Sequence, residues 1–138
     1  MGTARPLPTV IGPTENALRA LLARVLSTTR IRTYSAWVVM NIVDSSDDAA
    51  EGSRHMIADA LKAGLDDVDR LFSQLATAGL VGNDGLLTPL GQSELSAGRK
   101  AVSSVTTRLI DGISDEDQAT ARLVLDHVRR KAEEQLQL

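Results

Sequence analysis

Apolar side chains recur at helical spacing through the first third of the chain. From Glu15 to Ile31 they form one broad stripe, and Thr14, which follows Pro13, is placed to cap the first turn of a predicted helix. A second predicted helix begins after Thr33, another capping residue, and is apolar on nearly every side over residues 34–43. Because a helix of that kind is stable only among other elements, we expect residues 34–43 at the centre of the fold.

The polar middle of the chain predicts a loop and two shorter helices. Residues 44–53, DSSDDAAEGS, contain turn formers and no apolar periodicity, which indicates a solvated acidic loop. A short helix is predicted from about Arg54 to Lys62 and, after a tight turn, another from about Asp66 to Ala78. In the second of these the apolar residues fall at i, i+3, i+4 and i+7, and Gly79 is placed to end the helix.

The next segment has the pattern of a very small β-hairpin. The pairs Leu80-Val81 and Leu86-Leu87 flank the sequence NDG at 83–85, which is a hairpin-turn signal. Each apolar pair is only two residues long. We therefore expect a two-stranded hairpin of minimal length.

Two long helices are predicted in the last third of the chain. The pair Thr88-Pro89 is a strong helix start, and this helix is expected to end at Gly112. Ser114, followed by three acids, is placed to cap a final helix. The aliphatic residues at helical spacing are Leu95, Val102, Val105 and Leu109 on the first helix, and Leu123, Val128, Ala132 and Leu136 on the second. Since this surface is larger than one small unit covers, we expect a second copy of the chain to pack on it; the alternative is that the two helices pack on each other within one chain.

Composition favours one mainly α domain without a cofactor. Of the 138 residues, 43% are hydrophobic but only Tyr34, Trp37 and Phe72 are aromatic, so the core must be aliphatic, which favours helices packed on helices. The absence of cysteine excludes a disulfide framework, a thiol nucleophile and the cysteine-containing zinc sites. The two histidines have no clustered ligands, so neither a metal nor another cofactor is expected.

The first thirteen residues read as a flexible N-terminal arm. They contain three prolines and one arginine, and no apolar run long enough for a signal peptide or a membrane span. We therefore expect a cytoplasmic protein without membrane contact.

Charge is distributed unevenly along the chain. Residues 1–43 hold five Arg and one Glu, a balance of +4, whereas residues 44–85 hold nine acids and three bases, a balance of −6. Residues 86–138 hold seven bases and eight acids, a balance of −1. Cations are thus scarce in the middle of the chain, where the short helices are predicted.

Three motifs, in order, resemble those of MarR-type regulators (multiple antibiotic resistance). Residues 57–81, IADALKAGLDDVDRLFSQLATAGLV, are similar to the family's helix-turn-helix. Leu87-Thr88 with Gly91 resembles the start of the helix after the wing, and ISDED at 113–117 resembles the opening of the C-terminal helix. Each motif alone is weak, but the ordered set extends over residues 14–136.

The resemblance implies a mainly α, winged helix-turn-helix fold with a very short two-stranded wing. One domain would occupy residues 14–138, with dimerisation helices at 14–32 and 89–138 and the winged helix-turn-helix at 33–88. The family implies a homodimer whose winged units are spaced for two half-sites on double-stranded DNA, and hence a role in transcription regulation.

The charge of the predicted recognition helix opposes ordinary DNA binding. In the family its first turn presents small polar or basic groups, but here it carries Asp66, Asp67 and Asp69. Duplex DNA is bound chiefly by neutralising phosphates, which carboxylates cannot do. One carboxylate could accept a hydrogen bond from cytosine, but acids at a helix N-terminus also stabilise the helix, and that explains most of the cluster.

The wing also lacks a cation. The family's wing carries an arginine that enters the minor groove, whereas no basic residue lies between Arg70 and Arg99 here. Arg70 can contact phosphate, or it can pair with Asp66 or Asp67 one turn back. With the three acids, the candidate DNA-binding residues are Arg54, His55, Lys62, Arg70, Ser73, Gln74 and Thr77.

The resemblance also suggests a ligand site. Some family members bind small aromatic acids in a cleft between the dimer helices and the winged unit. The candidates here are Tyr34, Trp37, Met40 and His55, with Arg30 or Arg32 as the carboxylate partner. In the alternative, Trp37 and Met40 belong to the core and His55 to the surface.

Two classes of function remain. No phosphate-binding loop, nucleophile motif or paired carboxylates indicate an enzyme. The first hypothesis is a dimeric transcriptional regulator that binds operator DNA weakly or atypically, with or without control by a ligand. The second is a winged-helix dimer that has lost DNA binding and acts through a protein partner.

Overall fold

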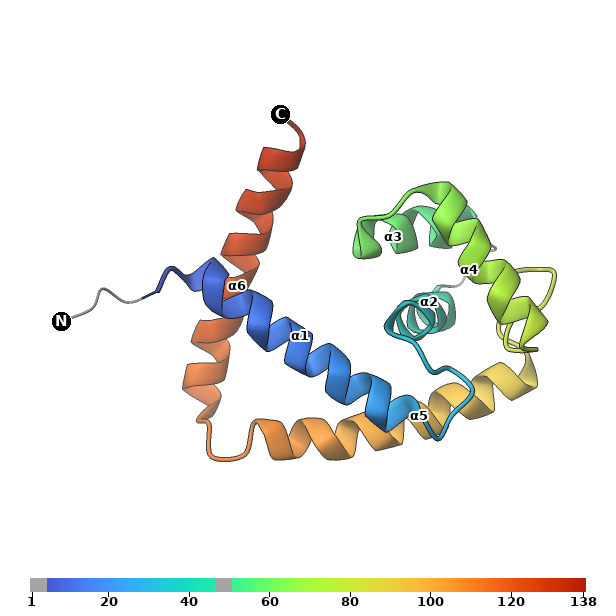
Figure 1. Ribbon diagram of the computed structural model, residues 1–138, viewed down its shortest axis with the longest axis horizontal. Helices are drawn as coiled ribbons and strands as arrows, with labels where there is room; N and C mark the ends of the chain where they lie inside the picture. The colour runs from blue at the N-terminus through green and yellow to red at the C-terminus, as the bar shows by residue number, and fades with distance from the viewer. Residues whose placement is uncertain (1–4, 47–50) are drawn as a thin grey trace. The chain divides into compact units, whose positions relative to one another are not determined.

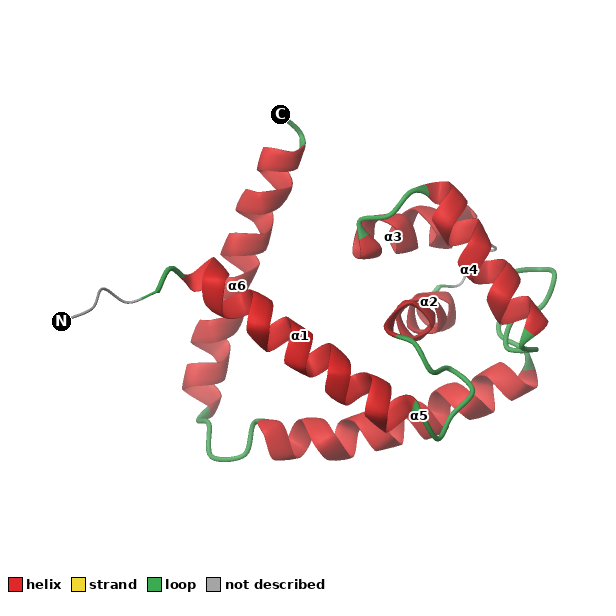
Figure 2. Cartoon of the chain, in the orientation of Figure 1, coloured by secondary structure: helices red, strands yellow, loops and turns green. Residues whose placement is uncertain are grey.

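The computed structural model describes residues 5–46 and 51–138, and in these residues the chain is helical with short connections (Figures 1 and 2). The helices are α1 (Leu7–Leu26), α2 (Tyr34–Ser45), α3 (Glu51–Leu61), α4 (Leu65–Thr77), α5 (Pro89–Leu109) and α6 (Asp115–Leu136). The chain forms two compact units, one ending at Ser104 and the other comprising Val105–Leu138. None of the described helices is both long and apolar enough to cross a membrane.

α1 begins much earlier than the sequence pattern predicts. Pro6 is its N-cap residue, so residues 7–13, expected in the flexible arm, are helical. Pro8 lies in the first turn, where a residue needs no hydrogen-bonded N–H, and its fixed φ angle suits a helix. Pro13 lies inside the helix. In the sequence alone these prolines indicate a loop, because the sequence does not show where the helix begins relative to them.

The predicted cap and the predicted end of α1 are both corrected. Thr14, expected to cap the helix, instead donates its hydroxyl to the Val10 carbonyl oxygen at 2.8 Å within it. The helix ends at Leu26 rather than Ile31. The Thr29 hydroxyl donates to the Leu26 carbonyl at 2.7 Å and accepts from the Ile31 amide at 3.2 Å, which closes a turn in place of further helix.

α2 occupies the centre of the first unit, as its apolar sequence predicts. The Thr33 hydroxyl caps it by accepting the Ala36 amide hydrogen at 3.1 Å, and the helix contacts α1, α3 and α4. The buried core consists of Leu26, Ile31, Ala36, Val39, Met40, Val43, Ile57, Val68, Leu75, Leu80, Val81 and Leu95. It is almost entirely aliphatic, as the composition indicated.

The acidic segment 44–53 is only partly a loop. α2 continues to Ser45 and α3 begins at Glu51, while residues 47–50 lie outside the described part of the chain. α4 ends as predicted: Gly79 adopts a φ of 78°, and its amide donates to Ala76 while the Leu80 amide donates to Leu75.

The predicted two-stranded wing reduces to one antiparallel bridge between Val81 and Leu87. The Gly82 amide donates to the Leu86 carbonyl at 2.9 Å, and Gly85 turns the chain with a φ of 77°. No β-strand occurs in the residues that the structure describes. Two apolar residues on each side are too few to extend the ladder.

Thr88 joins this hairpin to α5. Its hydroxyl donates to the Gly79 carbonyl and accepts the Gly91 amide hydrogen at 3.0 Å, which caps the helix. A Cβ on Gly91 would lie 2.1 Å from the Leu80 carbonyl oxygen. At this predicted helix start, Thr88 is therefore required for its hydrogen bonds and Gly91 for the close packing.

The first part of α5 is fastened to α2 and to the α1–α2 connection. Gly98 admits Trp37, whose ring would be 3.0 Å from an added Cβ. Arg99 donates to Asp44 at 2.8 Å and to Asn41 at 3.1 Å. The Arg30 amide donates to Glu94 at 3.1 Å. These contacts come from both ends of α2, so they fix the α5 segment up to Ser104 on the first unit.

In the second unit, α6 begins where the sequence predicts. The Ser114 hydroxyl accepts the Asp117 amide hydrogen at 3.1 Å. No residue of α6 is buried, and Leu123 and Leu136 are 71% and 74% exposed. Within the single chain, its apolar side is uncovered.

Candidate DNA-binding surface

α4 has one buried face and one exposed polar face. Val68 and Leu75 are buried against α2 and α3, while the predicted contacts Ser73, Gln74 and Thr77 are exposed. The Thr77 hydroxyl donates to the Ser73 carbonyl at 3.0 Å. The structure therefore brings these three side chains together on the outward side of the helix, as predicted.

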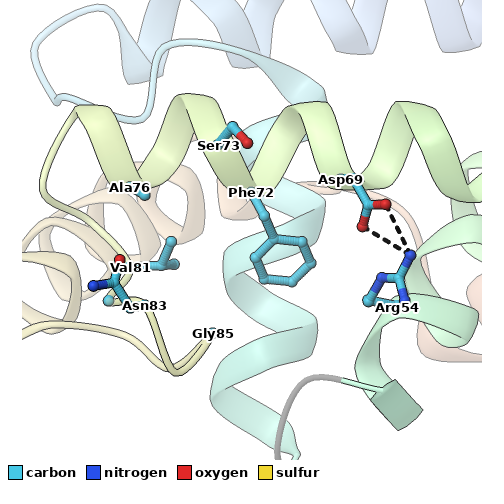
Figure 3. Close-up of a pocket in the computed structure, with 9 residues that line it drawn as sticks. Arg54, Asp69, Phe72, Ser73, Ala76, Val81, Asn83 and Gly85 are labelled. Carbon is cyan, nitrogen blue, oxygen red and sulfur yellow. Dashed lines mark hydrogen bonds and ion pairs between the residues drawn. The ribbon is translucent and has the colours of Figure 1, made fainter.

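Every predicted cation on α3, α4 and their connection contacts a carboxylate. Arg54 Nη2 lies 2.8 and 2.9 Å from the two carboxylate oxygens of Asp69 (Figure 3). Arg70 lies 3.5 Å from Asp67. Lys62 is 2.9 Å from the carboxylate of Asp59, a residue absent from the predicted site. The cations are thus partly neutralised before any phosphate approaches.

The three predicted acids, Asp66, Asp67 and Asp69, lie in different surroundings. Asp66 and Asp67 lie in the first turn of α4, whose N-cap, Gly64, has no side chain to accept its free N–H groups. Acids there stabilise the helix electrostatically. Asp66 forms no ion pair or hydrogen bond with the described residues, whereas Asp69 is held by Arg54 on a different helix. His55 is exposed on α3.

A hollow of about 260 Å³ lies where α3, α4 and the hairpin meet. Arg54 and Asp69 stand at one end of it, Phe72 lies in the middle, and Asn83 and Gly85 of the hairpin lie at the other end (Figure 3). Arg54 Nε is buried and has no hydrogen-bond acceptor among the described residues. No pattern in the sequence predicts this hollow, because its walls come from three elements.

The four predicted ligand-binding residues lie in different environments. Met40 is completely buried, Trp37 packs against Gly98, and His55 is exposed. Tyr34 lines a separate cavity of about 200 Å³ between α1 and α2. Met40 and Trp37 therefore belong to the core and His55 to the surface, as the alternative to a ligand site predicted.

The predicted carboxylate partners, Arg30 and Arg32, do not line the Tyr34 cavity. Arg30 is 3.7 Å from Glu94, and Arg32 is exposed with a φ of 63°. Arg19 lines the cavity instead, with its guanidinium 4.2 Å from the Tyr34 ring centroid. A hydrogen bond to Glu15 raises the pKa of Arg19 above its usual value. Glu15 and Arg19 are four residues apart on a helix, and this spacing could have predicted their ion pair from the sequence.

Within residues 5–46 and 51–138, no three histidine, aspartate or glutamate side chains lie close enough together to hold a metal ion.

No known family model matches the sequence, and no curated protein sequence matches it. Solved structures do. The transcriptional regulator PA3341 superposes with a TM-score of 0.76 at 22% identity, over 94% of this chain and 99% of that one. The MarR family protein Rv2887 of Mycobacterium tuberculosis, solved in complex with DNA, has a TM-score of 0.68 at 17% identity, over 91% and 98%. The chain has the fold of MarR-type regulators.

A third structure with this MarR-type fold is a protein of unknown function from Listeria innocua Clip11262, with a TM-score of 0.67 at 16% identity over 91% of both chains. At these identities the likeness is one of fold. The expected mainly helical architecture is confirmed.

The hairpin of this chain departs from the resemblance. The family's wing carries an arginine, whereas the exposed tip here consists of Asn83 and Asp84. The Asp84 carboxylate accepts the Leu86 amide hydrogen at 3.0 Å and so serves the turn itself. The wing contributes no cation to the surface beside α4.

Proposed function

We propose that the protein is a dimeric, cytoplasmic transcriptional regulator that binds double-stranded DNA through α4 and the adjoining hairpin and responds to a small-molecule ligand. The observation that carries the proposal is the exposed polar face of α4, with Ser73, Gln74 and Thr77, on a fold shared with Rv2887, which was solved in complex with DNA. Arg54, Lys62 and Arg70 would flank this face with cations, and His55 would lie beside them.

The proposed dimer forms through the terminal helices, α1 and residues 89–138, and leaves residues 33–88 free to bind DNA. Uncovered apolar side chains support it: α6 has no buried residue, and Leu109, Ile113, Leu123 and Leu136 are exposed in the single chain. Burial of such side chains is the main favourable contribution to association.

The ion pairs set the expected strength of DNA binding. A phosphate must compete with Asp69 for Arg54 and with Asp67 for Arg70, because each guanidinium already has a carboxylate. Exposed ion pairs are weak, so the competition is possible, but the net gain from each phosphate is reduced. We expect weak binding that is lost at moderate salt concentration.

The same ion pairs favour a second candidate function. A surface that neutralises its own cations suits contact with another protein better than contact with a polyanion. In that case the MarR-type dimer acts through a protein partner and does not use DNA.

The experiment that tests the proposal measures the affinity for duplex DNA, including the region upstream of its own gene, between about 50 and 200 mM salt. The key variant replaces Asp66, Asp67 and Asp69 by Ser, Thr and Ser. A matched control removes three acids from the second unit, Asp111, Glu116 and Glu134, each to Ser. If proximity to phosphate matters, only the α4 variant should bind more tightly.

The outcomes separate the two candidates. Binding by the wild type at low salt, strengthened in the α4 variant, supports the regulator. Binding by the α4 variant alone means that the fold can bind DNA but that this sequence does not use it to do so. That result supports the function through a protein partner. If neither binds, removal of the acids is not sufficient for DNA binding, and the missing wing arginine accounts for the result better than the acids do. Tight, specific binding by the wild type would show the charge argument to be wrong and direct attention to the +4 segment, residues 1–43.

A further inference from the structure

The sequence contains two Asp-Gly pairs, and both lie in turns. Asp84-Gly85 belongs to the hairpin, and Asp111-Gly112 lies in the connection from α5 to α6. An Asp-Gly pair can rearrange without an enzyme, because the glycine has no side chain to block the approach of its amide nitrogen to the aspartate Cγ. The rate of this reaction depends on how firmly the fold holds the attacking amide and the attacked carboxyl.

In the hairpin the fold holds both groups. Gly85 closes its own turn, because its amide donates to the Gly82 carbonyl at 3.0 Å. The Asp84 carboxylate accepts the Leu86 amide hydrogen at 3.0 Å. Two hydrogen bonds must therefore break before the Gly85 nitrogen can attack Asp84.

In the α5–α6 connection the fold holds neither group. The Ile113 amide donates to the Ile110 carbonyl at 3.1 Å, and this turn bond leaves the amide of the central Gly112 unused. The Gly112 amide and the Asp111 carboxylate form no hydrogen bond or ion pair with the residues that the structure describes. Asp111 is exposed, and no atom lies within 4 Å of the Cβ position of Gly112. The Gly112 nitrogen can therefore approach the carboxyl without displacing a neighbour.

We propose that Asp111 is a modification site at which aspartate converts spontaneously to isoaspartate. The Gly112 nitrogen attacks Cγ of the protonated Asp111 carboxyl, an N–Cγ bond forms, and the amide proton and the carboxyl hydroxyl leave as water. The product is a succinimide ring, which a second water molecule opens. Cleavage of the N–Cγ bond restores aspartate, whereas cleavage between the nitrogen and the α-carbonyl carbon gives isoaspartate. One water leaves and one enters, so the conversion needs no oxidant or other reactant.

The conversion lengthens the backbone inside the turn, because the chain then runs through Cβ and Cγ of residue 111. The hydrogen bond from the Ile113 amide to the Ile110 carbonyl spans the lengthened segment and cannot keep its geometry. The exposed side chains of Leu109 and Ile113, which belong to the proposed dimer surface, flank the site. We therefore expect the conversion to weaken the dimer. This consequence rests on the proposed function, whereas the modification itself does not.

The test follows both Asp-Gly pairs in one sample of the full chain, incubated at mildly acid pH because the attacked carboxyl must be protonated. Trypsin separates the two sites, since peptide 109–122 contains Asp111 and peptide 71–99 contains Asp84. Electron-transfer fragmentation then locates isoaspartate in each peptide. In the folded chain Asp111 should convert about 5- to 30-fold faster than Asp84, because two hydrogen bonds protect Asp84.

The unfolded chain provides the matched control. In guanidinium chloride the two sites should convert at similar rates, because both Asp-Gly pairs are followed by a large aliphatic residue, Leu86 or Ile113. Asp111→Glu keeps the charge but would need a larger ring, so it should abolish conversion at residue 111 and leave Asp84 unchanged. Asp115→Glu makes the same change within the same peptide and should have no effect on Asp111. Equal rates at the two sites in the folded chain, or no isoaspartate at residue 111, would overturn the proposal.

A second measurement addresses the dimer. After partial conversion, size-exclusion chromatography separates dimer from monomer, and isoaspartate at residue 111 should be enriched in the monomer. Equal isoaspartate content in the two fractions would overturn the link to dimer stability. If the freshly prepared protein is already a monomer, the proposed dimer fails, while the peptide analysis still decides the modification.

Discussion

The Gly91 backbone lies so close to the Leu80 carbonyl that an added Cβ would be 2.1 Å from the carbonyl oxygen. This contact joins the first turn of α5 to the start of the hairpin. The obstructing atom belongs to the backbone and therefore cannot rotate away as the end of a side chain would.

Gly91→Ala should destabilise the protein by about 2 kcal/mol, because either α5 or the hairpin must shift. Urea unfolding would measure the change in the free energy of unfolding. Gly52→Ala is the matched control: Gly52 is exposed on α3 with no atom near its Cβ position, so that substitution should be neutral or stabilise by up to about 1 kcal/mol. Equal effects at the two positions would contradict the packing argument.

Met40 and His55 should differ sharply when each is truncated. Met40 is completely buried, so Met40→Ala should cost about 2–5 kcal/mol of unfolding free energy. His55 is exposed, so His55→Ala should change stability by less than about 0.5 kcal/mol. Chemical denaturation of both variants checks this, and a small loss for Met40→Ala would restore it as a candidate for ligand contact.

Leu123→Glu should separate the proposed dimer while each chain stays folded. Leu123 is 71% exposed in the single chain, so its charge is tolerated by the monomer but not in an apolar interface. Light scattering at micromolar concentration measures the mass, and circular dichroism the helix content. Gln135→Glu, which adds the same charge at an exposed polar position of α6, should leave the dimer intact. A dimeric Leu123→Glu variant would place the interface elsewhere.

Arg70→Ala should weaken DNA binding and reduce the slope of log affinity against log salt by about one unit, the loss expected for one phosphate contact. The measurement is the affinity for one duplex at several salt concentrations. Arg129→Ala, which removes a cation paired with Glu133 on α6, serves as the control and should not change the slope. An unchanged slope for Arg70→Ala would mean that Arg70 serves only its pair with Asp67.

Features that depend on neighbours within one helical turn could be predicted from the sequence. Thr33 and Ser114 cap their helices because each hydroxyl accepts an amide hydrogen three residues ahead. The pairing of Arg70 with Asp67 is one of the two alternatives that the sequence predicts, because the two residues are three apart on a helix.

Features that depend on distant segments could not be predicted in this way. Arg54 and Asp69 are fifteen residues apart, and only the packing of α3 on α4 brings them together. The start of α1 cannot be predicted for another reason. A proline favours a first helical turn but opposes an interior one, and the sequence alone does not show which applies to Pro8.

The Thr88 hydroxyl, which bonds both the Gly79 carbonyl and the Gly91 amide, has a mechanical consequence. It makes a stiff corner of what would otherwise be a flexible joint, because the end of α4 and the start of α5 share one hydrogen-bonded group. A displacement of the first turn of α5 would therefore act on Gly79, just after the C-terminal end of α4, directly through these two hydrogen bonds. A single threonine side chain thus couples the position of α5 to the position of the end of α4.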